Sequence, residues 1–253
     1  MNKTCLFCQE RMTQDLEWHH LFTLGPIHFA SLCKECSQQF QKVNRLDKCR
    51  CPHCLRPIQK ESNNPFTAAC YYEEDQAYYC FDCHQWRMKL PPCYFYHDVL
   101  LKYNDALREW LYRYKYQGDV RQATVMKDYL TAIHRKYKDY VWTVLPSSPK
   151  HLKERLFHPT ERLLEEAKIP YERLFDYIGN NERQAAKTKQ QRLELRQPFR
   201  IKKDQLLPEK ILIFDDLYTT GATMMKAKEC VFGHNEQCEV YSLSLGRDSL
   251  QEK

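Results

Sequence analysis

The sequence lacks any apolar run that approaches the ~18 residues needed to cross a membrane as a helix. Residues 1–10 also lack the apolar h-region of a secretory signal peptide. We therefore expect a protein with no membrane span that works in the cytoplasm. Neither a helix-turn-helix nor a Cys2His2 finger pattern occurs, so recognition of a specific duplex sequence is not expected.

Glycine is scarce as well, at 6 of 253 residues, and the first part of the chain has few glycine turns and little apolar periodicity. The chain is nevertheless 43% hydrophobic, which is enough to bury a core. Cysteine is abundant instead, and 11 of the 13 cysteines lie between Cys5 and Cys93. In a reducing compartment this count favours metal binding over disulfides. The uneven distribution predicts two domains, a cysteine-rich one over 1–95 and a second one over 96–253.

Four Cys-x-x-Cys pairs can be read in the first domain. A spacer of two residues lets both sulfur atoms of a pair reach one tetrahedral zinc ion, and two pairs complete its ligand shell. The sequence therefore predicts a small zinc-ribbon or knuckle domain with two structural zinc ions. The eight predicted ligands are Cys5, Cys8, Cys33, Cys36, Cys51, Cys54, Cys80 and Cys83.

The spacing between the pairs bears on how they combine. The first two pairs are separated by 24 residues and the last two by 25, which indicates tandem units and favours sequential pairing. A cross-braced arrangement, or a union of the middle two pairs across 14 residues, remains open. Four more side chains lie near enough in sequence to substitute as ligands, although we expect them to be bystanders: Cys49, Cys70, His53 and His84.

A closed shell of four sulfur ligands leaves no open coordination position, so catalysis by zinc is not expected. The metal would support folding, and the same region could also be a docking surface for a partner or for nucleic acid; redox chemistry is the remaining alternative. Eight thiolates would add about −8 and two bound zinc ions about +4, which reduces the formal net charge from +6 to about +2. Attraction to nucleic acid therefore needs a local basic patch.

The second domain alternates between helical and strand-like patterns, which predicts a parallel α/β sheet. The runs expected to form strands are 141–145, 175–178, 211–214 and 239–245. The expected helices are 100–114, 126–133, 161–168 and 222–232, the last one stopped by Gly233.

The segment 211–223 joins an apolar run, two carboxylates and a loop of phosphate size. Asp215 and Asp216 follow the run at the carboxyl end of the expected strand, where open α/β sheets bind ligands. The loop Thr219-Thr220-Gly221-Ala222-Thr223 offers hydroxyls and backbone N–H groups at a helix start, whose dipole favours an anion. Gly221 lets the backbone close on a phosphate. Because paired carboxylates accept hydrogen bonds, they suit ribose hydroxyls, and the segment predicts a site for a phosphorylated sugar.

This segment resembles the signature of type I phosphoribosyltransferases, which bind phosphoribosyl pyrophosphate (PRPP) with magnesium. The resemblance implies an α/β fold with a type I phosphoribosyltransferase-like parallel sheet, preceded here by the small zinc domain. It implies that Asp215 and Asp216 contact the ribose hydroxyls in the catalytic site. It also implies that Thr219, Thr220, Gly221, Ala222 and Thr223 hold the 5-phosphate.

Three further segments, 114–119, 145–159 and 180–199, occur in order with the cysteine pairs and the acidic motif. Together they resemble the ComF-type late-competence proteins, which are cytosolic factors of DNA uptake in naturally transformable bacteria. The resemblance spans nearly the whole chain. It implies single-stranded DNA and other uptake proteins, such as a companion helicase, as partners. It also implies that Lys115 and Arg155 steady the pyrophosphate.

The segment 155–159 departs from the family pattern Arg-Gly-Phe-Asn-Gln. Arg155 and Phe157 match, but Leu156, His158 and Pro159 replace the glycine, the asparagine and the glutamine. A leucine adopts positive φ only at a cost, and the loss of the amides removes donors and acceptors. We therefore expect altered ligand binding on this side, with the ribose-phosphate side intact.

A basic stretch follows at 182–203, with eight cations against two carboxylates, Glu182 and Glu194, before Asp204. One interpretation is a solvated flap over the site. The other is a surface for single-stranded nucleic acid, with cations along the backbone and nearby aromatics to stack on bases. The candidate residues for nucleic acid are Arg183, Lys187, Lys189 and Arg192.

The sequence is therefore compatible with two functions. One is a competence factor that handles single-stranded DNA and uses a PRPP-type pocket for binding or regulation. The other is an active phosphoribosyltransferase that moves ribose 5-phosphate to a nucleobase or amine and releases pyrophosphate. A third reading, a metal scaffold with an inactive pocket, would follow if Leu156 blocks the site.

Overall fold

The computed structural model describes residues 3–12, 30–45, 50–58, 71–74, 77–88, 91, 95–178 and 199–248. A five-stranded parallel sheet forms its centre, in the order β5-β11-β10-β6-β7. The strands are β5 (His97–Lys102), β6 (Val141–Val144), β7 (Tyr171–Glu172), β10 (Lys210–Tyr218) and β11 (Glu239–Arg247). The predicted α/β class with a type I phosphoribosyltransferase-like sheet is confirmed.

The middle of the sheet is the most apolar part of the described chain. Residues 211–214 of β10 are fully buried, because β11 pairs along one side of this strand and β6 along the other. Both faces are also covered, and a strand in this position takes a continuous apolar run rather than an alternating one. The strand extends four residues beyond the predicted end at 214, so both aspartates lie within it.

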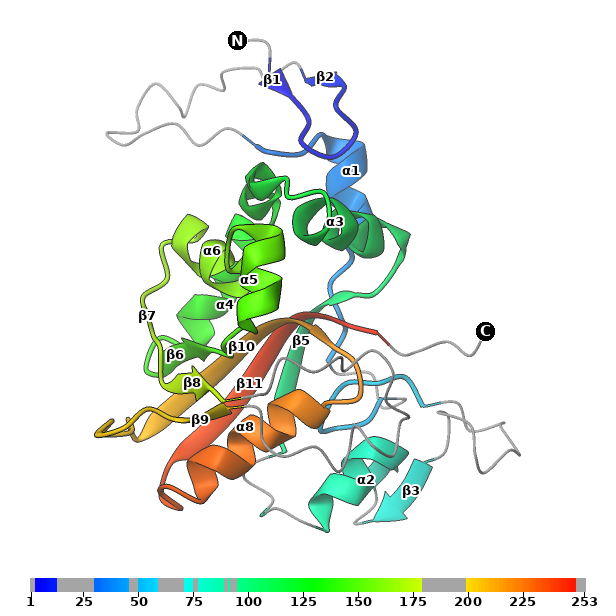
Figure 1. Cartoon of the computed structure of the whole chain (residues 1–253). Coiled ribbons are helices and arrows are strands. Elements are labelled where there is room, and N and C mark those ends of the chain that lie inside the picture. Colours follow the sequence, from blue (N-terminus) through cyan, green and yellow to red (C-terminus); the bar gives the residue numbers. More distant parts are fainter. Residues whose placement is uncertain are drawn as a thin grey trace.

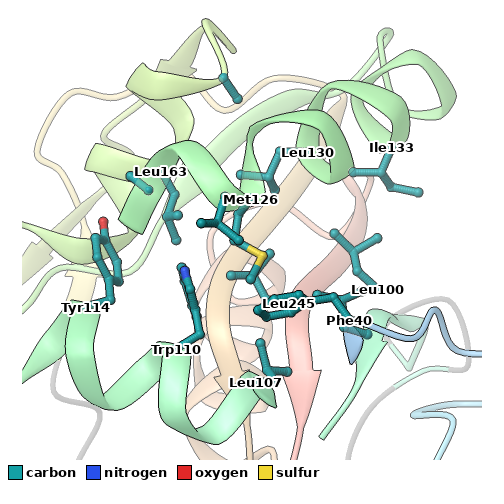
Figure 2. Close-up of a cluster of buried hydrophobic side chains, with 14 of the residues drawn as sticks. Phe40, Leu100, Leu107, Trp110, Tyr114, Met126, Leu130, Ile133, Leu163 and Leu245 are labelled. Atoms are coloured by element: carbon teal, nitrogen blue, oxygen red, sulfur yellow. The ribbon is translucent and has the colours of Figure 1, made fainter. Parts of the chain in front are cut away.

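Helices cover the two faces of the sheet (Figure 1). One face carries α3 (Asp105–Lys115), the 3-10 turn η3 (Val120–Gln122), α4 (Ala123–Lys136), α5 (Pro149–Arg155) and α6 (Pro159–Glu166). The other face carries α8 (Ala222–Phe232), which has the predicted bounds and Gly233 as its C-cap. Figure 2 shows side chains of α3 and α4, among them Trp110 and Met126, packing with Leu163 of α6 and Leu245 of β11.

The expected helix from Leu100 is wrong in its first part. Leu100 belongs to β5, and α3 begins only at Asp105, after Asn104. The Asn104 side chain accepts a hydrogen bond from the backbone N–H of Leu107 at 3.0 Å, which satisfies a free donor of the first turn. The apolar spacing continued across this boundary because β5 and α3 both bury side chains in the same core.

The predicted strand at 175–178 does form, but outside the central sheet. It is β8 (Phe175–Tyr177), and it pairs antiparallel with β9 (Phe199–Ile201). Phe175 and Phe199 contact each other edge to face, with 5.7 Å between ring centroids, and both are buried. The strand at 175–177 thus pairs with β9, which follows it in sequence, and not with a strand of the central sheet. The helix expected at 161–168 lies two residues earlier, because His158 caps α6 at Glu161.

The cysteine-rich part contributes to two different cores. Its first unit contains β1 (Lys3–Thr4), β2 (Arg11–Met12) and α1 (Lys34–Gln39), and packs with α3 and α4. Its second unit contains β3 (Tyr71–Glu74), β4 (Ala77–Cys80) and α2 (Phe81–Arg87), and packs on the side of α8. The division at 95/96 stays a prediction about units that fold independently.

Candidate functional site

Eight of the described cysteines form two groups, and their sulfur atoms are gathered as a metal requires. Within each group the four sulfur atoms lie within 4.8 Å of one another. The first cysteine group is Cys5, Cys8, Cys33 and Cys36, and the second cysteine group is Cys51, Cys54, Cys80 and Cys83. Sequential pairing is therefore confirmed. His53 and His84 belong to neither group, and Cys49 and Cys70 lie outside the described residues.

The two groups are built by the same local structure. In each unit the first pair forms a turn that is closed by a left-handed residue, Gln9 (φ 64°) or Leu55 (φ 57°). The backbone N–H of that residue donates to the carbonyl of the first cysteine, at 2.9 Å in one turn and 2.8 Å in the other. The second pair opens a short helix, with Cys33 or Cys80 as the N-cap. The tandem units that the spacing predicts are confirmed.

The donor chemistry fits zinc at both groups. Each offers four sulfur atoms and completes a tetrahedral shell, which leaves no position for a substrate. Backbone N–H groups also point at the sulfurs: those of Cys33 and Cys36 donate to Cys5 and Cys33 at 3.3 and 3.4 Å. The second cysteine group is entirely buried, whereas Cys8 of the first is exposed. Both groups can therefore hold a metal, and the second would hold it away from water.

The acidic pair lies in the carboxyl-terminal half of β10. Asp216 is buried, and its Oδ2 atom lies 2.6 Å from Nζ of Lys115, at the end of α3. Asp215 is half-buried and accepts a hydrogen bond from the backbone N–H of Asp216 at 2.9 Å. The lysine expected beside the pyrophosphate thus contacts the acidic pair directly.

The charges of these groups are strongly coupled. Burial, and next the charge of Asp216, raise the pKa of Asp215 to about 7. Burial would lower the pKa of Lys115, but the charges of Asp216 and Asp215 outweigh it and raise the pKa. Asp215 therefore changes its protonation near neutral pH, while Lys115 stays charged.

The loop 219–223 connects β10 to α8, and Gly221 is the N-cap of the helix. Gly221 has φ 78°, and a Cβ there would stand 1.9 Å from the Tyr218 hydroxyl. Only glycine therefore fits. Thr219 and Thr223 are exposed, and Thr220 Oγ1 accepts from the N–H of Ala222 at 3.4 Å. An accessible helix start with hydroxyls around it can receive an anion.

Arg155 ends α5, and its guanidinium lies over the Tyr116 ring, 5.8 Å from the centroid. Its positive charge opposes the rise in the pKa of Lys115 that the two aspartates cause, whereas only Lys115 contacts the acidic pair directly. Leu156, next to Arg155, adopts φ 64° as the C-cap of α5, with 89% of its surface exposed. Leu156 thus adopts the positive φ that we expected to be costly for a leucine, and the leucine side chain points into solvent.

His158 has a structural part in the segment that departs from the family pattern. Its Nε2 atom accepts from the backbone N–H of Ser147 at 3.3 Å, and Nδ1 bonds to the Thr160 hydroxyl at 3.1 Å. Burial lowers the pKa of His158, which favours the neutral ring that these bonds need. The histidine therefore holds the 145–148 loop against α6.

The candidate nucleic-acid residues Arg183, Lys187, Lys189 and Arg192 lie outside the described residues. The structure adds a pair that sequence reasoning missed. Tyr112 on α3 and Tyr116, the C-cap of α3, are exposed by 51% and 71% and stack with 5.9 Å between ring centroids. Their spacing of four residues on the side of the helix away from Trp110 was the available signal.

No helix in the described part of the chain is long and apolar enough to cross a membrane.

Comparison with known proteins places the chain in a family. It is 30% identical over 227 residues to "Competence protein ComFC" of Streptococcus pneumoniae, covering 89% of this chain and 91% of that one. It is 29% identical over 253 residues to the Bacillus subtilis protein of the same name, covering 96% of this chain and 94% of that one. No family model matches the sequence. The similarity covers most of this chain and of each relative, and the chain belongs to the ComFC family of competence proteins.

Proposed function

We propose that this chain is a cytoplasmic competence factor that handles single-stranded DNA during natural transformation and carries a PRPP-binding pocket and two structural zinc ions. The competence role rests on family membership, since both relatives are named competence proteins. A cytoplasmic place is supported by the described cysteines, none of which forms a disulfide. Other uptake proteins, including a companion helicase, are its proposed partners.

Support for the pocket comes from the arrangement around the acidic pair. Asp215 and Asp216 would accept from the ribose hydroxyls, and the loop 219–223 would surround the 5-phosphate with hydroxyls and N–H groups. Lys115 and Arg155 precede the acidic pair in sequence, whereas the loop follows it. These two cations would bind the pyrophosphate. When bound, magnesium would neutralise pyrophosphate oxygens and fix their geometry.

The pocket is tested by changing the acidic pair without changing its size. In Asp215→Asn/Asp216→Asn the affinity for PRPP with magnesium should fall at least ~10-fold, about 1.4 kcal/mol. Calorimetry measures the affinity, and circular dichroism checks the fold. An affinity for PRPP in the double variant equal to that of the parent would contradict the assignment of the acidic pair to the PRPP site.

The observation that carries nucleic-acid binding is the exposed tyrosine pair. Single strands expose the faces of their bases, and Tyr112 and Tyr116 are exposed aromatic side chains that lie beside the guanidinium of Arg155. Duplex DNA stacks its bases internally and cannot use such a surface. The protein should therefore bind single strands more tightly than duplex of equal length, and more weakly as salt rises.

Two variants separate stacking from charge. Tyr112→Ala/Tyr116→Ala should weaken single-strand binding by about 1–3 kcal/mol per lost stack, with an unchanged salt slope. Lys187→Gln/Lys189→Gln/Arg192→Gln should instead make the salt slope shallower. Tyr96→Ala is a matched control, since Tyr96 is 50% exposed but precedes β5 at the opposite end of the sheet. If neither variant differs from the control in fluorescence anisotropy, both surfaces are excluded.

A second candidate function is an active phosphoribosyltransferase, and the Asp215–Gly221 geometry favours it. The reaction would join ribose 5-phosphate to a nucleobase or amine and release pyrophosphate. Incubation of the protein with PRPP, magnesium and a pool of acceptors measures this directly. Pyrophosphate release that depends on an acceptor and disappears in the double asparagine variant would support this function. PRPP binding without pyrophosphate release would contradict it and would support a pocket used only for binding.

A further inference from the structure

Arg247, the last residue of β11, has a buried guanidinium. The residue is 6% exposed, and its Nε, Nη1 and Nη2 atoms find no hydrogen-bond partner among the described residues. A buried charge without a partner destabilises a fold, and native structures avoid it. An anion is therefore expected within reach of this side chain.

The second cysteine group is the source of that anion. Burial would lower the pKa of Arg247, but the charges of Cys54, Tyr218 and Cys80 outweigh it and raise the pKa. The packing agrees, because Arg247 lies over the ring of Tyr218, and Tyr218 belongs to the same buried cluster as all four cysteines of this group. Four thiolates around one zinc ion leave a net charge of about −2. Because these cysteines are all buried, water cannot stabilise that charge, as it can at the exposed Cys8 of the first group.

The same guanidinium contacts Tyr218, the strand residue that directly precedes the loop of the proposed phosphate site. Arg247 lies over the ring of Tyr218, 4.6 Å from its centroid, and His97 lies against that ring with 4.0 Å between centroids. The hydroxyl of Tyr218 in turn fills the space beside Gly221 that a Cβ would occupy. Tyr218 packs in one buried cluster with the four cysteines, and it thus connects this cluster and Arg247 to the loop.

We propose that Arg247 is the internal counter-ion of the second cysteine group when it holds zinc, and that through Tyr218 it positions the Gly221 loop. Arg247 is a positioning residue in this arrangement. Loss of the metal and its thiolates would leave the cation without its partner charge, and the loop would then be held less firmly. The inference uses the proposed zinc but does not depend on PRPP as the ligand of the loop.

The test compares Arg247→Gln and Arg247→Lys in the full chain. Two quantities are measured: the release of zinc to a coloured chelator, and hydrogen exchange of the backbone amides at 218–225. In Arg247→Gln one of the two zinc ions should leave at least ~10-fold faster than in the parent, and the loop should lose protection. Arg247→Lys retains a charge and should stay close to the parent. The other zinc ion, at the first group, is an internal control.

Cys8→Ser is a matched control, because it should lose the first zinc without changing exchange in the loop. Zinc release from Arg247→Gln at the parent rate would overturn the counter-ion role. Faster release with unchanged loop protection would overturn the link through Tyr218. If Arg247→Gln does not fold, chelator titration of the parent decides: loop protection should fall only with loss of the second zinc. A parent without zinc would overturn the zinc assignment itself.

Discussion

The side-chain ammonium of Lys115 lies 2.6 Å from the Oδ2 atom of Asp216, and this ion pair joins the end of α3 to β10. Both side chains are largely shielded from water. A ligand that bound Asp216 through its ribose hydroxyls and Lys115 through its pyrophosphate would contact both members of this ion pair. The pair also makes the fold sensitive to the loss of one partner.

We expect Lys115→Met to lower the free energy of unfolding by about 3 kcal/mol, because it leaves the buried Asp216 carboxylate without a partner. Lys115→Met/Asp216→Asn should recover most of the loss, since it also removes the charge. Urea denaturation at pH 8 measures both variants. Additive losses in the double variant would show that the pair does not couple.

Asp215 should make the stability depend on pH. Its pKa is raised by burial and by Asp216 from an ordinary value of 3.8 to about 7, so the folded state holds this proton more tightly than the unfolded state. Stability from this group is therefore full below pH 3.8 and is lost as pH rises to about 7. Relative to Asp215→Asn, the parent should lose stability across this window in urea denaturation. Parallel curves for the two proteins would contradict the assignment.

Gly221→Ala should distort the loop 219–223. The new Cβ would stand 1.9 Å from the Tyr218 hydroxyl, at a residue with φ 78°. We expect a loss of about 1–3 kcal/mol in stability and weaker binding of PRPP or inorganic phosphate, measured by thermal unfolding and calorimetry. Gly118→Ala is the control, since Gly118 has φ 69° but open space around it. It should show the backbone strain alone, with a smaller loss.

Leu156→Gly should stabilise the protein by about 0.5–1 kcal/mol. Leu156 adopts φ 64° while its side chain is 89% exposed, so the change relieves backbone strain and removes little packing. Thermal unfolding against Leu152→Gly, inside the same helix, checks the direction. Leu152→Gly should destabilise, because its position needs helical φ. A destabilised Leu156→Gly would show that the leucine packs in solution.

The cysteine pairing and the acidic loop could be predicted because their signals are local. Two cysteines in one turn reach one metal whatever the rest of the chain does, and equal spacing indicated the tandem units. The loop at Gly221 likewise depends on a strand, a glycine and a helix that follow one another in sequence. The boundary near Leu100 failed because apolar spacing reports burial, and both β5 and α3 are buried in one core.

By itself, the sequence determined the parallel α/β sheet, the two cysteine groups and the position of the aspartates at the end of a buried strand. Tertiary structure alone decided which charges meet. Lys115 reaches Asp216 across 101 positions of sequence, and Arg247 lies over Tyr218, which packs in one cluster with the second cysteine group. No local pattern encodes such pairs, because their energy depends on burial and distance in the folded state, and neither exists until the sheet has brought the elements together.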